Sequence, residues 1–253
     1  MRLKLPIIIA AVVTVAISIP LAYKLYLTDN YQPRSALNME SEEFRDLRQQ
    51  GKRASTMKNY SQAIAVYEAA LKMRPDNAEV RNDLGYVYYE YALDQAGPNW
   101  PSWESDLTGR TPTEVSRELE TALKLISSGY IHLTVDDKEG VKPAITKAKA
   151  ANCQVYTTPW KEGAEIHILV GTTKEYLMRA RDSFMAAIDI KDAYAPAFQN
   201  LGALWMKIGL RNVAVQNLER AYKLEPRNED LARYLQQLQE QPNLITTYVG
   251  SAE

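Results

Sequence analysis

The two histidines of this chain, His132 and His167, are the residues best suited to acid–base or metal chemistry. Imidazole titrates near neutral pH and also ligates metal ions. Each histidine is flanked by aliphatic residues, in segments typical of β-strands. If both strands present these side chains on one face, the imidazoles approach one another. A histidine in a strand is more often a surface or structural residue, so we expect neither a catalytic nor a metal site.

Other chemistry is sparse. Cys153 is the single cysteine, with no partner for an internal disulfide and no other ligand at metal-binding spacing. The sequence has no Gly-rich phosphate loop and no Gly-x-Ser-x-Gly nucleophile motif. The 30 Lys and Arg residues nearly balance the 31 Asp and Glu residues, so no positive field favours nucleic acid. We therefore expect a protein that is not an enzyme, needs no cofactor and binds no nucleic acid.

Most of the chain is predicted to be helical, because a helical pattern recurs along it. One copy runs through Gly51, Ala63, Tyr67, Ala70 and Pro75, at offsets of 12, 16, 19 and 24 from the glycine. A second copy has the same offsets in Gly202, Ala214, Leu218, Ala221 and Pro226. Small residues suit close helix crossings, the bulky residue fills the space beside them, and proline ends the second helix.

A third copy is split. It begins at Gly85, 34 residues after Gly51, and resumes with Ala180, Phe184 and Ala187, so 83 residues are added between its two helices. The residues and the period resemble the tetratricopeptide repeat (TPR) family, in which antiparallel helix pairs stack into a solenoid. The resemblance implies a protein that binds a protein partner rather than an enzyme.

In that family the first helix of each repeat lines the concave surface. The corresponding positions that we expect to bind the partner are Arg48, Lys52, Asn82, Tyr86, Tyr89 and Gln199. Arg48 and Asn82 resemble two members of the clamp by which some relatives hold a C-terminal carboxylate. Lys52 stands where such clamps usually have Asn, and the third repeat lacks their basic residues, so the match is partial.

Leu5 to Tyr23 form an uncharged run of 19 residues between Lys4 and Lys24. This length suits a helix that crosses ~30 Å of hydrocarbon. We expect an uncleaved single-pass membrane anchor with a cytoplasmic N-terminus, which places the bulk of the protein on the extracytoplasmic, periplasmic side of the cell envelope. The alternative is a cleaved signal peptide that releases a soluble exported protein.

The insertion is predicted to begin with a loop, Asp94 to Arg110, whose Trp100 and Trp103 fold back onto the solenoid. Thr111 to Glu114 has the form of a capping box that starts a helix ending near Ser128. A second capping box, Thr172 to Glu175, is predicted to start the helix that completes the split repeat.

Between these helices the sequence predicts a small β-α-β-β unit. Its strands are Tyr130 to Val135, Gln154 to Thr158 and Ile166 to Val170, with a helix from Lys142 to Ala151 after the first strand. The crossover predicts that the first two strands are parallel, and the short turn predicts that the last two are antiparallel.

The predicted fold class is therefore mainly α: a TPR-like solenoid of about three repeats and a capping helix, with an α/β insertion and an N-terminal transmembrane helix. The predicted segments are an anchor (1–27), a tether (28–41), one and a half repeats (42–93), the insertion (94–171), the remaining solenoid with its capping helix (172–241) and a tail (242–253). We expect a membrane-anchored adaptor. The alternative is an enzyme or ligand-sensing domain within the insertion.

Overall fold

The computed structural model describes residues 41–240 of the chain. The predicted anchor, the tail and all but the last residue of the predicted tether lie outside the described residues. Within 41–240, no helix has the length and apolar character needed to span a bilayer. The chain divides into two units after Arg45, so helix α3 (Glu42–Thr56) begins before this boundary and continues beyond it.

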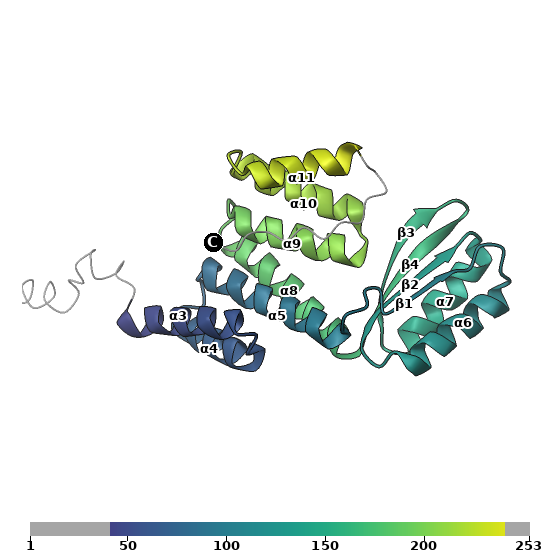
Figure 1. The fold of residues 1–253 in the computed structure, drawn as a ribbon, viewed down its shortest axis with the longest axis horizontal. Coiled ribbons are helices and arrows are strands. Elements are labelled where there is room, and N and C mark those ends of the chain that lie inside the picture. Colours follow the sequence, from purple (N-terminus) through teal and green to yellow (C-terminus); the bar gives the residue numbers. More distant parts are fainter. Residues whose placement is uncertain (1–40, 241–253) are drawn as a thin grey trace, which may run out of the picture. The chain divides into compact units, whose positions relative to one another are not determined.

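The helices of the repeat pattern form close to their predicted positions (Figure 1). After α3 come α4 (Tyr60–Met73), α5 (Ala78–Ala96), α8 (Gly171–Ile190), α9 (Ala195–Ile208), α10 (Arg211–Leu224) and α11 (Glu229–Glu240). Asparagines begin two of them, because Asn59 and Asn77 accept hydrogen bonds from the backbone N–H groups of Gln62 and Val80. Local capping chemistry thus fixes where α4 and α5 start.

The helices pack in pairs through a repeated contact between a glycine and a bulky side chain. A Cβ atom on Gly51 would lie 2.7 Å from the Tyr67 ring, and one on Gly202 would lie 2.7 Å from Leu218. Only a residue without a side chain fits so close to the facing helix. The contact therefore joins α3 to α4 and α9 to α10 in the same way.

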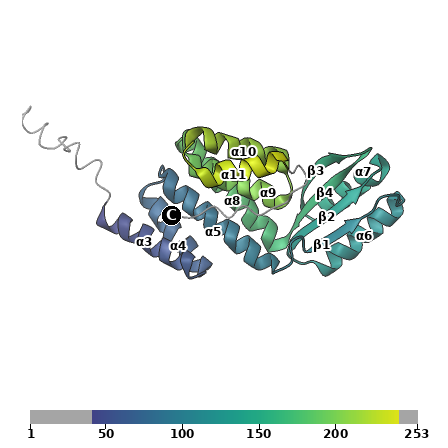
Figure 2. The ribbon, with the colours of Figure 1, turned by 45° about the horizontal axis from the view of Figure 1, so that its top comes forward.

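Helices α5 and α8 make the corresponding pair, although the insertion lies between them in the chain. A Cβ atom on Gly85 would lie 2.7 Å from the Phe184 ring. The two helices run side by side in both Figure 1 and Figure 2. Thr173 Oγ1 in α8 donates to the carbonyl oxygen of Ala92 in α5, at 3.4 Å. The split repeat is thus reassembled in space.

Helix α11 covers the apolar side of the last pair, as the sequence predicts. Leu231, Leu235 and Leu238 are buried in a cluster with Leu218 and Met206. Burial of these leucines stabilises the end of the solenoid, because the last pair would otherwise expose an apolar surface to water.

The insertion contains a four-stranded sheet in the order β1-β2-β4-β3. Its elements are β1 (Trp103–Asp106), α6 (Pro112–Leu125), β2 (Gly129–Val135), α7 (Lys138–Ala150), β3 (Gln154–Trp160) and β4 (Gly163–Val170). Strands β1 and β2 are parallel, and β4 is antiparallel to both of its neighbours, β2 and β3. Figure 1 shows β1 to β4 with α6 and α7 beside them.

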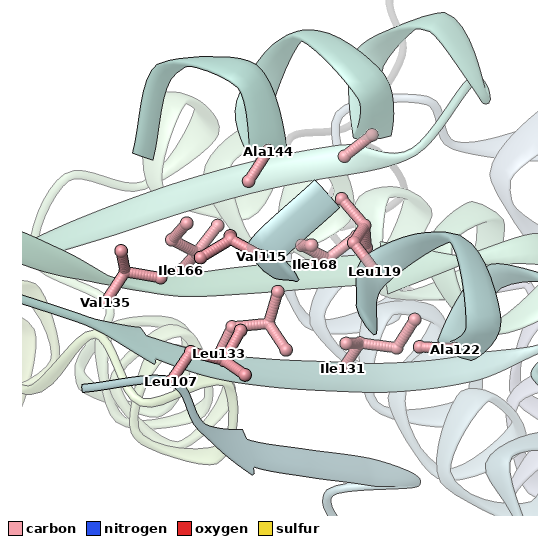
Figure 3. Close-up of a cluster of buried hydrophobic side chains, with 11 residues drawn as sticks. Leu107, Val115, Leu119, Ala122, Ile131, Leu133, Val135, Ala144, Ile166 and Ile168 are labelled. Atoms are coloured by element: carbon pink, nitrogen blue, oxygen red, sulfur yellow. The ribbon is translucent and has the colours of Figure 1, made fainter. Parts of the chain in front are cut away.

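Helices α6 and α7 both cover one face of this sheet. Figure 3 shows the core between them, where side chains of β2 and β4 point toward the helices. The buried members of the cluster are Leu107, Val115, Leu119, Ala122, Ile131, Leu133, Val135, Ala144, Ala148, Ile166 and Ile168. The alternation along β2 and β4 leaves His132 and His167 on the opposite face.

Four expectations about the insertion need correction. The predicted loop contains a strand, β1, which is too short and too polar to give a strand pattern. Helix α7 begins at Lys138, four residues before the predicted start at Lys142, because Asp137 caps it by accepting a hydrogen bond from the backbone N–H of Glu139. Strands β2 and β3 do run in the same direction, as predicted, with β4 between them. Helix α6 ends at Leu125, since Ile126 is already extended. The predicted capping box at Thr172 does not form, because α8 begins at Gly171 without a side-chain cap.

The capping box at Thr111 does form, with reciprocal hydrogen bonds between Thr111 and Glu114. The two tryptophans behave differently from one another. Trp100 Nε1 donates to the carbonyl oxygen of Lys207 in α9, at 2.7 Å, so it does fold back onto the solenoid. Trp103 Nε1 instead donates to Glu118 in α6, at 3.1 Å, and so belongs to the insertion.

Candidate functional site

The first candidate site is a polar strip along α3, α5 and α9, which we call the first-helix strip. It consists of Arg48, Lys52, Glu79, Asn82, Asp83, Tyr86, Gln199 and Asn200. An ion pair of 2.7 Å joins Arg48 in α3 to Glu79 in α5. A hydrogen bond of 2.9 Å joins Asn200 Nδ2 in α9 to Asn82 Oδ1 in α5. These contacts tie consecutive first helices together.

Asp83 gives the strip its main electrostatic feature. Burial raises the pKa of this carboxyl group to about 6, although Arg48 and Lys52 nearby act in the opposite direction. Because the Asp83 carboxylate is poorly hydrated in its ionised form, a further positive or hydrogen-bonding group would stabilise it. The repeat pattern in the sequence does not single out Asp83, because nothing in its spacing separates it from an ordinary surface acid.

The structure places the predicted partner-binding residues in different environments. Lys52 is exposed, and Tyr86 and Gln199 are partly exposed. Burial and the neighbouring Glu90 raise the pKa of the Tyr86 hydroxyl to about 12, so it remains a hydrogen-bond donor. Tyr89, however, is only 8% exposed. It therefore offers the partner almost no surface.

Asn82 and Arg48 already have partners and are not arranged as a carboxylate clamp. Asn82 is buried and its side-chain oxygen accepts from Asn200. Arg48 pairs with Glu79 and also lies in the field of Asp83. Since two carboxylates already balance this guanidinium, an incoming carboxylate would have to compete with them. The geometry therefore weighs against a C-terminal carboxylate as the ligand.

The second candidate site is on the sheet face opposite α6 and α7, which we call the histidine face. It consists of Glu104, Tyr130, His132, Thr158, Glu165 and His167. The register of β2 and β4 places His132 directly opposite His167. The two imidazole rings are stacked, with centroids 5.2 Å apart and planes 14° apart. The structure thus meets the condition under which the sequence predicts that the two imidazoles approach one another.

A chain of hydrogen bonds runs through this face. Tyr130 Oη lies 2.8 Å from His167 Nδ1, and Thr158 Oγ1 lies 3.2 Å from His167 Nε2. Thr158 Oγ1 also donates to Glu165 Oε2, at 2.8 Å. Beside this chain, His132 Nδ1 lies 3.1 Å from Glu104 Oε1. Neighbouring side-chain oxygens therefore hold both ring nitrogens of His167 and the Nδ1 atom of His132.

The histidine face lies against the C-terminal end of α9. Gly209 ends this helix in the left-handed conformation, with φ of 91°. A Cβ atom there would lie 2.8 Å from His167 Cε1 and 3.3 Å from Tyr130 Oη. Tyr156 of β3 makes an edge-on contact with Trp205, with centroids 5.5 Å apart. His167 is consequently buried, whereas His132 keeps some exposure.

The packing of α9 against the histidine face shields His167 from water. Burial lowers the pKa of His167 to about 4, and the neighbouring His132 acts in the same direction. The imidazole is therefore neutral at pH 7. One feature of the sequence indicates this arrangement. In Tyr130-x-His132 and Glu165-x-His167 the two named residues are two positions apart, so each pair lies on one face of its strand.

Comparisons with known proteins bear on the helical part of the chain. Residues 57–90, which run from the turn after α3 through α4 and into α5, match the family model described as TPR repeat. No match was found among curated protein sequences. The repeat geometry and the matched segment support the TPR family for the helical part of the chain.

Several solved structures are similar at low sequence identity. The first TPR of Spaghetti (RPAP3), bound to the HSP90 peptide SRMEEVD, is 12% identical over 81% of this chain and 98% of that chain, with a TM-score of 0.44. A crystal structure of MamA is 17% identical over 77% and 85%, with a TM-score of 0.27. TTC0263, a thermophilic TPR protein of Thermus thermophilus, is 16% identical over 79% and 83%, with a TM-score of 0.30.

Proposed function

We propose that this chain is a membrane-anchored, non-enzymatic adaptor that binds a protein partner through the first-helix strip. TPR domains act by binding proteins, and the match of residues 57–90 supports this class of function here. The anchor is inferred from the apolar run Leu5 to Tyr23 and its flanking lysines. Arg2, Lys4 and the amino terminus slightly outweigh Lys24 and Arg34, which favours an extracytoplasmic position for the solenoid.

The observation that carries the proposal is the arrangement of side chains along consecutive first helices. The strip combines an exposed cation, Lys52, with a half-buried acid, Asp83, and a partly exposed ring, Tyr86. Rings at the centre of an interface supply contact area, and charges at its rim steer association. Because burial makes ionisation of Asp83 unfavourable, we expect the partner to present a basic or hydrogen-bonding group that stabilises its carboxylate.

Site-specific photo-cross-linking in native membranes tests the proposal. A photoreactive residue would replace Lys52 or Tyr86 in the strip, and matched controls would replace Lys72 in α4 or Gln216 in α10, which are exposed on second helices. We expect the same adduct from both strip positions and none from the controls. Adducts from the second-helix positions alone would place the binding surface elsewhere and reject the strip.

The anchor needs its own measurement. We expect the mature protein to keep the full mass of 28.6 kDa and to stay with the membrane fraction after washing with high salt. A shorter mature chain in the soluble fraction would instead show signal cleavage and an exported soluble protein.

A further inference from the structure

We propose that His132, Glu165 and His167 form a binding site for a divalent transition-metal ion of the zinc class. The sequence alone predicts no metal site, because a histidine in a strand is more often a surface or structural residue. It also leaves the relation between the two strands open. The register of β2 and β4 supplies that relation. This inference is independent of the proposed partner binding, since it concerns the insertion and not the first-helix strip.

The three side chains converge because of sheet geometry. Glu165 and His167 are two residues apart on β4, so they share a face, and His132 lies directly across from His167. One ligand atom from each residue lies within 4.8 Å of the other two. Around a tetrahedral zinc ion such atoms lie roughly 3.4 Å apart, given bond lengths of about 2.1 Å. Closing this difference requires side-chain rotations of His132 and Glu165, neither of which is fully buried.

Neighbouring oxygens orient both imidazoles as metal ligands require. In metal sites the second ring nitrogen of a ligating histidine is usually held by a carboxylate or another oxygen, which fixes the ring orientation. Here Glu104 holds His132 Nδ1 and Tyr130 holds His167 Nδ1. His132 thereby keeps its Nε2 atom for a ligand, whereas in His167 a metal ion at Nε2 would replace the contact with Thr158 Oγ1.

The charges of the three ligands suit a divalent transition-metal ion. Two imidazole ligands and one carboxylate favour zinc-class ions over Mg²⁺ or Ca²⁺, which prefer all-oxygen sites. Glu165 in the first sphere and Glu104 just outside it balance the two positive charges of the ion. Three protein ligands leave a fourth position for water, and the 65% exposed side chain of Glu104 marks the open side of the site.

Metal binding and the hydrogen-bonded chain require different tautomers of His167. In the metal-free chain, Tyr130 donates to Nδ1, Nε2–H donates to Thr158, and Thr158 donates to Glu165, which satisfies every group. Coordination through Nε2 requires the proton to move to Nδ1, where it is donated to Tyr130 Oη. The ring stays neutral in both states. The tautomer of His167 therefore reports whether the metal occupies the proposed position.

The test uses the full-length chain in detergent, without a histidine tag, after treatment with a chelator. Zn²⁺ binding would be measured by calorimetry, and Co²⁺ binding by its visible absorption, which reports coordination geometry. We expect one ion per chain. The variants His132→Asn, His167→Asn and Glu165→Gln should each weaken binding by about 100-fold or more, and the outer-sphere variant Glu104→Gln by roughly tenfold.

The matched control is Glu162→Gln, which makes the same change in the same hairpin at a side chain that is 89% exposed. It should bind Zn²⁺ as the unmodified chain does. Circular dichroism would check the fold of each variant. If His167→Asn does not fold, His132→Asn and Glu165→Gln carry the test, because neither residue is fully buried.

Nitrogen NMR on histidine-labelled chain gives a second readout, since the protein contains only two histidines. Zn²⁺ should convert His167 from the Nε2–H to the Nδ1–H tautomer. Two outcomes would overturn the proposal. One is the absence of stoichiometric binding of either ion. The other is binding that persists in His132→Asn and Glu165→Gln with the tautomer of His167 unchanged.

Discussion

Gly85 and Phe184 are in direct contact across α5 and α8, in the same relation as Gly51 and Tyr67 across α3 and α4. The first pair is separated in the chain by a complete α/β insertion, whereas the second pair is separated only by a short connection. The solenoid therefore uses one rule for packing helices, whatever the length of the segment that joins them.

The contact predicts that Gly85→Ala destabilises the fold. A Cβ atom 2.7 Å from the Phe184 ring forces the ring or helix α5 to move, which we expect to cost ~1–3 kcal/mol of unfolding free energy. Denaturant titration would measure it. Combining the change with Phe184→Leu should recover part of the loss, because a smaller side chain then faces the new methyl group. Equal stability of Gly85→Ala and the unmodified chain would contradict the pairing.

The reassembled pair also predicts that the insertion can be removed. Deleting residues 98–169 and joining the ends by a short Gly-containing turn should leave a helical protein. Thr173 already bonds to Ala92 across the junction, so the two ends lie close together. Far-ultraviolet circular dichroism should show a higher helical content per residue and a cooperative thermal transition. A non-cooperative transition would mean that the contacts of α9 with the insertion are needed for folding.

Asp83 and His167 predict opposite dependences of stability on pH. The folded state raises the pKa of Asp83, so this group binds more protons when folded, and stability falls as pH rises from about 4 to about 6. Compared with the unmodified chain, Asp83→Asn should gain about 1–3 kcal/mol above pH 6 and nothing below pH 4. Unfolding free energies of the two proteins across this range would give the difference directly.

Protonation of His167 gives stability the opposite dependence on pH. Its pKa is lowered to about 4, so the unfolded chain binds the extra proton, and stability is lost as pH falls from about 6.5 to 4. Measured with a chelator present, His167→Gln should remove this acid-side loss. If the unmodified chain and His167→Gln lose stability in parallel below pH 6.5, the imidazole is not held neutral by burial.

The first-helix strip predicts different effects for its charges and its ring. Lys52→Ala should slow association with the cross-linked partner and reduce the salt dependence of the rate, because an exposed cation acts through long-range steering. Tyr86→Ala should weaken binding by about 1 kcal/mol or more, mainly through faster dissociation. Surface plasmon resonance at two salt concentrations would separate the two effects.

Tyr89 is the internal control for that experiment. Because it is buried, Tyr89→Ala should lower the melting temperature and should not act specifically on partner binding. A stable Tyr89→Ala protein that has lost its partner would show that the ring becomes exposed when the partner binds.

The repeat could be predicted from the sequence because its determinants are local. The glycine, alanine and bulky positions recur at fixed offsets, and each offset corresponds to one contact between paired helices. The order of the strands could not be predicted, since the turn between β3 and β4 does not reveal that β4 also pairs with β2. For the same reason the approach of His132 to His167 was only conditional in the sequence: it depends on a register set by long-range pairing.

The candidate strip was predicted in position but not in detail. The spacing correctly places Arg48 and Tyr86 on first helices. It does not show that Tyr89, in the same turn of α5, is buried whereas Tyr86 is partly exposed. The importance of Asp83 is likewise a property of its surroundings. Desolvation arises from packing between α3, α5 and α9, which no single helix pattern encodes.

Strand β3 lies at one edge of the sheet, and edges of this kind can template aggregation by pairing with the same strand of another molecule. Pro159 stands inside β3 and has no N–H to offer an incoming strand. Lys161 follows directly after the strand with a charge and a left-handed backbone, at φ of 48°, which turns the chain away from an extended path. The hairpin of β3 and β4 therefore carries its own protection against fibril-like stacking along this edge.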